Sequence, residues 1–139
     1  MVERGFTLRE HTSEVAVEAT GQSLGEAFAA TADGMAAVAS ESVPDGGDRF
    51  EIEVVAEDEE ALLYDYLAEL LYERDVRDVL PVENEATVQT DDGEWRLSGS
   101  ARGVPLDALS ALEVKAPTYS EMSVAEVDGG WRVYVVLDV

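Results

Sequence analysis

Apolar and polar residues alternate in several short stretches of the chain, the pattern of strands that bury one face. The clearest stretch spans residues 14–20, where Val15, Val17 and Ala19 alternate with polar residues. Gly21 ends this stretch. We expect further strands at residues 6–8 and 50–54. The first part of the chain therefore contributes strands with one face on a core.

The last third of the chain predicts two hairpins. The turn signal Asp91-Asp92-Gly93 lies between the predicted strands 85–90 and 94–101, and Asp128-Gly129-Gly130 lies between 122–127 and 131–137. Short Asp/Gly turns between runs of strand-forming residues favour antiparallel pairing. Residues 105–112, between the hairpins, fit either a short helix or an irregular crossover.

Two other segments repeat their apolar residues every three to four positions, as an amphipathic helix does. One helix is expected to start after Ser23, which forms a capping box with Glu26, and to run to about Ala39. The other is expected to start after Asp58 and to fray between Arg74 and Asp78. Its apolar stripe comprises Leu62, Leu63, Tyr66, Leu67, Leu70 and Leu71.

Together these elements predict an α+β fold. We expect a single layered domain over residues 1–139, with a largely antiparallel sheet of about six strands and two long helices on one face.

The charge of the chain gives information about the environment of the protein. The chain has 31 acidic and 9 basic residues, a net charge of -22, and the acids are spread along its length. Such a surface repels nucleic acid, so direct RNA binding is not expected. A solvated acidic coat indicates a halophilic source, although an ordinary acidic protein also fits.

Two further observations concern location and redox chemistry. The sequence has no membrane-length apolar run and no signal-peptide pattern at its start, so a cytoplasmic protein is expected. It also has no cysteine, which excludes disulfides and thiolate ligands.

Familiar catalytic motifs are missing, and the candidate residues are few. His11, the sole histidine, could orient a catalytic or metal-bound group or could be structural. Lys115, the sole lysine, could meet a carboxylate or phosphate of a partner or form a structural ion pair.

A metal site is the third candidate. Asp138 and the main-chain oxygens of Val139 follow a predicted strand, and Glu14 would join them if its strand begins beside the end of the last. Hard divalent cations such as calcium or magnesium prefer such oxygen ligands. Exposed acids without a metal are the other interpretation, because most Asp and Glu residues lie at the surface.

The same segments resemble the archease family from end to end. Phe6 and His11-Thr12-Ser13-Glu14 are similar to its aromatic residue and His-Thr-Ala-Asp segment, with glutamate in place of aspartate. The segment around Phe28 and the leucine-rich stretch 62–72 resemble its packing residues. The most specific matches are Val114-Lys115-Ala116-Pro117-Thr118-Tyr119 and the terminal Val136-Leu137-Asp138-Val139.

The resemblance implies a function. Archeases are partners of the RtcB-class RNA ligase in tRNA splicing and promote its guanylylation and multiple turnover, without a reaction of their own. By resemblance the metal ligands are Glu14, Asp138 and Val139, the metal is calcium (or magnesium or manganese), and His11, Lys115 and Tyr119 contact the partner or support the site.

Two other functions remain open at this stage. One is a chaperone or modulator of a tRNA methyltransferase, a role that the same family resemblance suggests. The other is a metal-dependent hydrolase built on Glu14, Asp138 and His11, which would also need a substrate pocket.

Overall fold

The structure is a computed structural model that describes residues 2–11, 13–40, 42–106 and 113–139. Within these residues, seven strands and two helices follow one another in the order β1 β2 α1 β3 α2 β4 β5 β6 β7. The strands are β1 (Gly5–His11), β2 (Glu14–Gly21), β3 (Arg49–Ala56), β4 (Val79–Asp91), β5 (Glu94–Pro105), β6 (Ala116–Val127) and β7 (Gly130–Asp138). The helices are α1 (Leu24–Ala39) and α2 (Glu59–Arg77).

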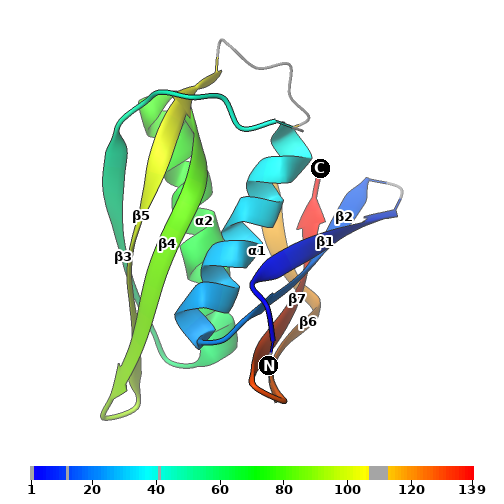
Figure 1. Cartoon of the computed structure of the whole chain (residues 1–139), viewed down its shortest axis with the longest axis vertical. Helices are drawn as coiled ribbons and strands as arrows, with labels where there is room; N and C mark the ends of the chain where they lie inside the picture. The colour runs from blue at the N-terminus through cyan, green and yellow to red at the C-terminus, as the bar shows by residue number, and fades with distance from the viewer. Residues whose placement is uncertain (1, 12, 41, 107–112) are drawn as a thin grey trace.

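The strands form two antiparallel sheets. One sheet has the order β1-β2-β7-β6 and the other the order β3-β5-β4. Every strand pair is antiparallel, and the pairing between β2 and β7 joins a strand early in the chain to the last strand. Figure 1 shows the three-stranded sheet on the left and the four-stranded sheet on the right.

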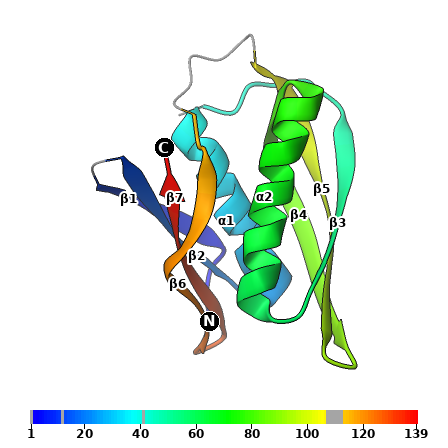
Figure 2. The same cartoon turned by 180° about the vertical axis from the view of Figure 1, so that it is seen from behind.

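Both helices lie between the two sheets. α1 is in front in Figure 1, and α2 is in front in Figure 2, which shows the molecule from behind. Two glycines of α1 show how close this packing is. A side chain at Gly25 would collide with the backbone of β4, and one at Gly34 would collide with Val17 of β2 and Phe6 of β1. The helix layer is therefore in direct contact with a sheet on each side.

Local signals in the sequence set the helix starts. Ser23 accepts a hydrogen bond from the Glu26 N–H at 3.1 Å, as a capping residue should. The Glu26 carboxylate accepts from the N–H of Gln22 at 3.3 Å, one residue earlier than in a standard capping box. Asp58 accepts from the N–H of Ala61 at 2.8 Å and so caps α2.

The core fills the space between helices and sheets. Phe28 of α1 and Leu63 and Leu67 of α2 are fully buried, against Val17 of β2 and Leu97 of β5. β2, β3, β5 and β7 supply residues of one face to this hydrophobic cluster, and α2 supplies the leucine stripe predicted for it. The main cluster therefore spans both sheets.

The predicted fold class is confirmed, with one difference in arrangement. The strands divide into two sheets instead of one sheet of about six, and the helices cover one face of each. Both predicted hairpins form, with strands longer than expected. Of residues 105–112, Pro105 ends β5, while 107–112, and with them the choice between helix and crossover, lie outside the described residues. None of the described helices has the length and apolar character to cross a bilayer.

Candidate functional site

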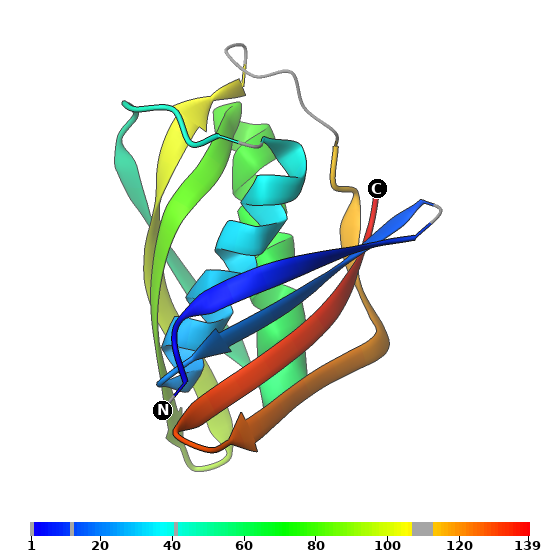
Figure 3. The ribbon, with the colours of Figure 1, turned by 45° about the vertical axis from the view of Figure 1, so that its right-hand side comes forward.

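The backbone register brings three of the predicted site residues into one row across the four-stranded sheet. His11 of β1 lies opposite Glu14 of β2, Glu14 lies opposite Asp138 of β7, and Asp138 lies opposite Ala116 of β6. Figure 3 shows the C-terminal end of β7 between the β1–β2 hairpin and the start of β6. Residues that are 124 positions apart in sequence thus become direct neighbours.

The side chains of Glu14 and Asp138 share the outer face of this sheet. Their chain neighbours Val15 and Leu137 point the other way and are buried, with exposed fractions of 6% and 0%. Directly opposed residues have Cβ atoms about 4.5–5.5 Å apart. Two carboxylates therefore lie side by side, and neither forms an ion pair with any described side chain.

Backbone hydrogen bonds fix both flanks of the row. The N–H of Val139 donates to the Ser13 carbonyl oxygen at 3.1 Å, and the N–H of Lys115 donates to the Asp138 carbonyl oxygen at 2.8 Å. Ser13 has a left-handed backbone conformation with φ of 66°, which makes the tight turn between β1 and β2. The final residues of the chain are thereby held beside the turn and the lysine.

Arg74 of α2 holds the segment that carries Lys115. Its Nη1 donates to the Val114 carbonyl oxygen at 2.8 Å, and its guanidinium lies 3.0 Å from Asp75 and 3.7 Å from Glu113. Val114 is buried, while the side chain of Lys115 is exposed. Arg74 was not among the residues predicted from the sequence. The only signal was an arginine beside the leucine stripe of a helix in a chain with few basic residues.

Tyr119 lies apart from the row. It follows Thr118 in β6, where the register with β7 shifts, and its ring stacks on Tyr64 of α2 with centroids 4.5 Å apart and planes 5° from parallel. Burial raises the pKa of the Tyr119 hydroxyl, and the nearby Asp65 carboxylate raises it further. The structure therefore places this residue in an aromatic pair and not beside Glu14 and Asp138.

The row can bind a hard cation only if main-chain oxygens act as ligands beside the two carboxylates. Among the described side chains, no three histidine, aspartate or glutamate groups are arranged to hold a metal. Glu14 and Asp138 supply two carboxylates, and the main-chain oxygens of Val139, next to Asp138, would supply the remaining protein ligand. Oxygen donors of this kind suit calcium or magnesium, so the donor set fits the expected chemistry.

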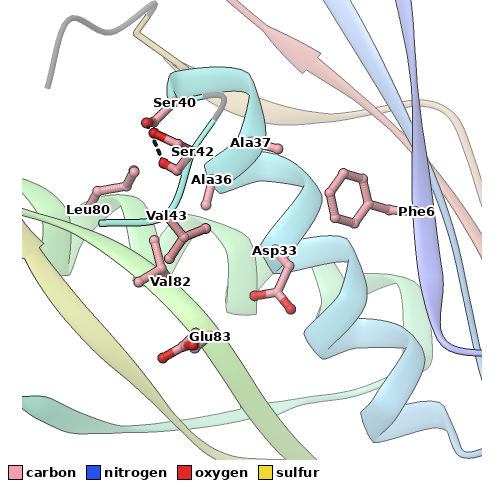
Figure 4. Close-up of a pocket in the computed structure, with 10 residues that line it drawn as sticks. All are labelled: Phe6, Asp33, Ala36, Ala37, Ser40, Ser42, Val43, Leu80, Val82 and Glu83. Atoms are coloured by element: carbon pink, nitrogen blue, oxygen red, sulfur yellow. Dashed lines mark hydrogen bonds between the residues drawn. The ribbon is translucent and has the colours of Figure 1, made fainter. Parts of the chain in front are cut away.

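A separate cavity of about 280 Å³ lies between α1, β4 and Phe6 of β1 (Figure 4). Its floor is apolar, formed by Ala36 of α1 and by Leu80 and Val82 of β4, with Phe6 of β1 at one side. Asp33 points toward the cavity from α1. This cavity was not predicted from the sequence, although Asp33, an aspartate among the small apolar residues of α1, was a signal for it.

The Asp33 carboxylate is the centre of a polar cluster beneath that cavity. Its Oδ1 accepts from the backbone N–H and the side-chain Nδ2 of Asn84, at 3.0 and 2.9 Å. Its Oδ2 accepts from the Arg4 guanidinium at 3.1 Å. Asn84 is fully buried. Through these hydrogen bonds the cluster joins β4 and the start of the chain to α1.

Replacing Asp33 by alanine is expected to lower the free energy of unfolding by about 1–3 kcal/mol, because the buried N–H of Asn84 loses its acceptor. Asp33→Asn keeps one acceptor oxygen and should lose less. Asp45→Ala, at an exposed loop position, is the control. Denaturant unfolding measures the three values. Equal stability of the alanine variants at positions 33 and 45 would show that the cluster does not stabilise the fold.

The described architecture defines an α+β protein with two helices between antiparallel sheets and a pair of carboxylates where the start of β2 meets the end of β7. The sequence pattern of the Archease protein family (MTH1598/TM1083) matches residues 6–139, and the chain belongs to this family. Protein archease of Pyrococcus furiosus is 33% identical over 135 residues, which cover 94% of this chain and 95% of that protein. The archease of Methanothermobacter thermautotrophicus is 30% identical over 139 residues, covering 98% and 99% of the two chains.

Solved structures agree with the fold. The solution structure of protein 1598 from Methanobacterium thermoautotrophicum has a TM-score of 0.84 at 29% identity and covers 97% of this chain and 99% of its own. The crystal structure of an archease from Thermotoga maritima, described as a possible chaperone, has a TM-score of 0.62 at 20% identity and covers 94% of each chain. The resemblance expected from the sequence motifs is thus confirmed at the level of the family.

Proposed function

We propose that this protein is a non-catalytic activator of an RtcB-class RNA ligase in tRNA splicing, acting in the cytoplasm through the carboxylate row. Membership of the archease family supports the partner, as the sequence resemblance implied. The observation that carries the proposal is the direct opposition of Glu14 and Asp138, with Val139 and Lys115 held beside them by backbone hydrogen bonds.

In this proposal the row acts as an oxygen-rich pole. Glu14, Asp138 and the main-chain oxygens of Val139 would hold a divalent cation, calcium in the first instance. Bound there, the cation would supply positive charge for a nucleotide phosphate of the ligase. The backbone of Lys115 is hydrogen-bonded to Asp138, and its exposed amine would add a second positive charge at the same edge.

The same carboxylates would serve the protein without a metal. A pair of adjacent negative charges resembles a phosphate, so the pole could occupy a phosphate-binding groove of the ligase while RNA is absent. Complementary potentials speed such an encounter more than they strengthen it. The net charge of -22 suits a partner with a basic surface and not RNA itself.

The test is RNA joining by the cognate ligase, at high salt, with this protein at substoichiometric amounts. We expect more than one turnover per ligase with the protein, and about one without it. Single-turnover guanylylation, measured in parallel, shows whether the nucleotide-loading step is the one stimulated. Unchanged turnover with folded protein would reject the activator function.

A chaperone or modulator of a tRNA methyltransferase is the second candidate. The description of the Thermotoga maritima archease as a possible chaperone favours it. It predicts that the methyltransferase, and not the ligase, is recovered with this protein from a lysate.

A further inference from the structure

The outward side of α2 carries an apolar ridge. Tyr64, Ala68, Tyr72 and Val76 follow one another at every fourth position, and such positions form a ridge along a helix surface. Tyr72 and Val76 are 59% and 62% exposed. In Figure 2 this helix faces the viewer between β6 and β3, which are edge strands of the two sheets.

The ridge continues onto β6 through the aromatic pair. Tyr119 is 54% exposed and stacks in parallel on Tyr64 at the first half of α2. Stacking fixes both rings, so little side-chain freedom remains to be lost when a partner binds. We call the surface formed by Tyr64, Tyr72, Val76 and Tyr119 the α2 face.

The surroundings of the α2 face are acidic. Asp65 is exposed beside Tyr64, and after burial the groups that raise the Tyr119 pKa are Asp65, Tyr64, Asp58 and Glu60, three of which are carboxylates. Burial and then the charge of Glu73 raise the pKa of Glu69 on the next turn of the same helix. A cation brought to this surface would relieve repulsion that the protein already contains.

The two arginines in the last turn of α2 do not supply that cation. Arg74 is engaged with the Val114 carbonyl oxygen and with Asp75. Arg77 is engaged with Glu73 at 3.1 Å and lies over the ring of Phe50 at 4.4 Å. The contact between Arg77 and Phe50 is an example, within this fold, of a guanidinium that lies over an aromatic ring.

We propose that the α2 face is a docking surface for a segment of the ligase in which arginine side chains lie between apolar ones. The apolar ridge would pack into a groove between side chains of that segment. The aromatic pair would bind one of its guanidinium groups, and the surrounding carboxylates would attract the arginines. Exposed tyrosines that meet arginine are typical of the energetic centres of protein interfaces. A second copy of this chain would bring the same negative charge and is disfavoured. The inference rests on the proposed function for the identity of the partner.

The docking surface and the carboxylate row have separate tasks in this scheme. The α2 face supplies affinity, and the row at the C-terminal end of β7 supplies the effect on the ligase. Loss of affinity can be overcome by adding more protein, whereas loss of the effect cannot. Titration of the activator therefore distinguishes the two surfaces.

The experiment measures binding to purified ligase and stimulation over a range of activator concentrations, for the wild-type protein, Tyr72→Ala/Val76→Ala, and Tyr119→Ala. Val55→Ala, a single exposed apolar residue on β3, is the control. Because the replaced side chains of α2 are exposed, thermal unfolding should change little. We expect both α2-face variants to raise the dissociation constant and the half-maximal concentration at least tenfold, with an unchanged plateau of stimulation.

The outcomes separate the two proposals. Wild-type stimulation together with unchanged binding of the variants overturns the docking surface and leaves the activator function intact. Binding without stimulation, weakened by the α2-face variants, rejects the activator function and supports the docking surface. Absence of any binding by the wild-type protein overturns both. A wild-type dimer that the variants dissociate assigns the face to a second copy and also overturns the proposal.

Discussion

Replacing Asp138 by alanine is expected to abolish stimulation of the ligase at every activator concentration, because the row loses one of its two side-chain carboxylates. The position is exposed, and its strand hydrogen bonds use backbone atoms that alanine retains. The fold should therefore persist. Turnover of the ligase with the variant at saturating concentration is the measurement, and a plateau at least tenfold lower is the expected result.

Controls separate loss of the row from loss of charge. Asp128→Ala removes one carboxylate from the exposed turn between β6 and β7 and should leave stimulation unchanged. Calorimetric titration of each variant with calcium tests the metal assignment independently of the ligase, and Asp138→Ala should lose binding that Asp128→Ala retains. Full stimulation by Asp138→Ala would exclude the row from the activator function.

Replacing Phe28 by alanine is expected to lower the free energy of unfolding by about 3–5 kcal/mol, the usual cost of removing a buried aromatic ring. Phe28 is fully buried in α1, and this helix packs between two sheets that it helps to hold together. The surrounding side chains belong to different layers, so they are poorly placed to fill the space left by the ring. Denaturant unfolding in high salt measures the loss.

The matched control is Phe6→Ala, which removes the same side chain from a position that is 40% exposed. Its loss should be clearly smaller. If Phe28→Ala does not fold, Phe28→Leu keeps most of the apolar volume and should remain measurable, with a loss on the order of 1 kcal/mol. Equal losses for the two alanine variants would show that the inter-sheet core does not depend on this ring.

Much of this structure could be predicted from local patterns. Ser23 and Asp58 start the two helices where the capping signals indicated, and both glycine-containing turns close hairpins. The leucine stripe of α2 is buried as its spacing required. Such features depend on neighbours within a few residues, which a single sequence displays directly.

Long-range contacts explain what could not be predicted. The separation of the strands into two sheets depends on which strand edges meet, and alternation alone does not specify the partner. Asp33 and Arg74 act on residues 51 and 40 positions away, so their roles depend on the fold. The convergence of Glu14 and Asp138 was expected only if β2 began beside the end of β7, which the register now shows.

Both sheets are open, and this has a consequence for how copies of the protein behave in solution. Among the described strands, those at the ends of each sheet have a neighbour on one side only, namely β1 and β6 in one sheet and β3 and β4 in the other. Exposed strand edges favour edge-to-edge aggregation unless charges oppose it. Glu51 and Glu53 lie exposed on β3 and Glu83 and Glu85 on β4. Arginines pair with Glu53, Glu83 and Glu85, so the charge that opposes contact between separate molecules is the excess of acidic residues over the whole chain, a net charge of -22. The acidic coat thus favours colloidal stability, and acidification toward the isoelectric point of about 4.1 removes that protection.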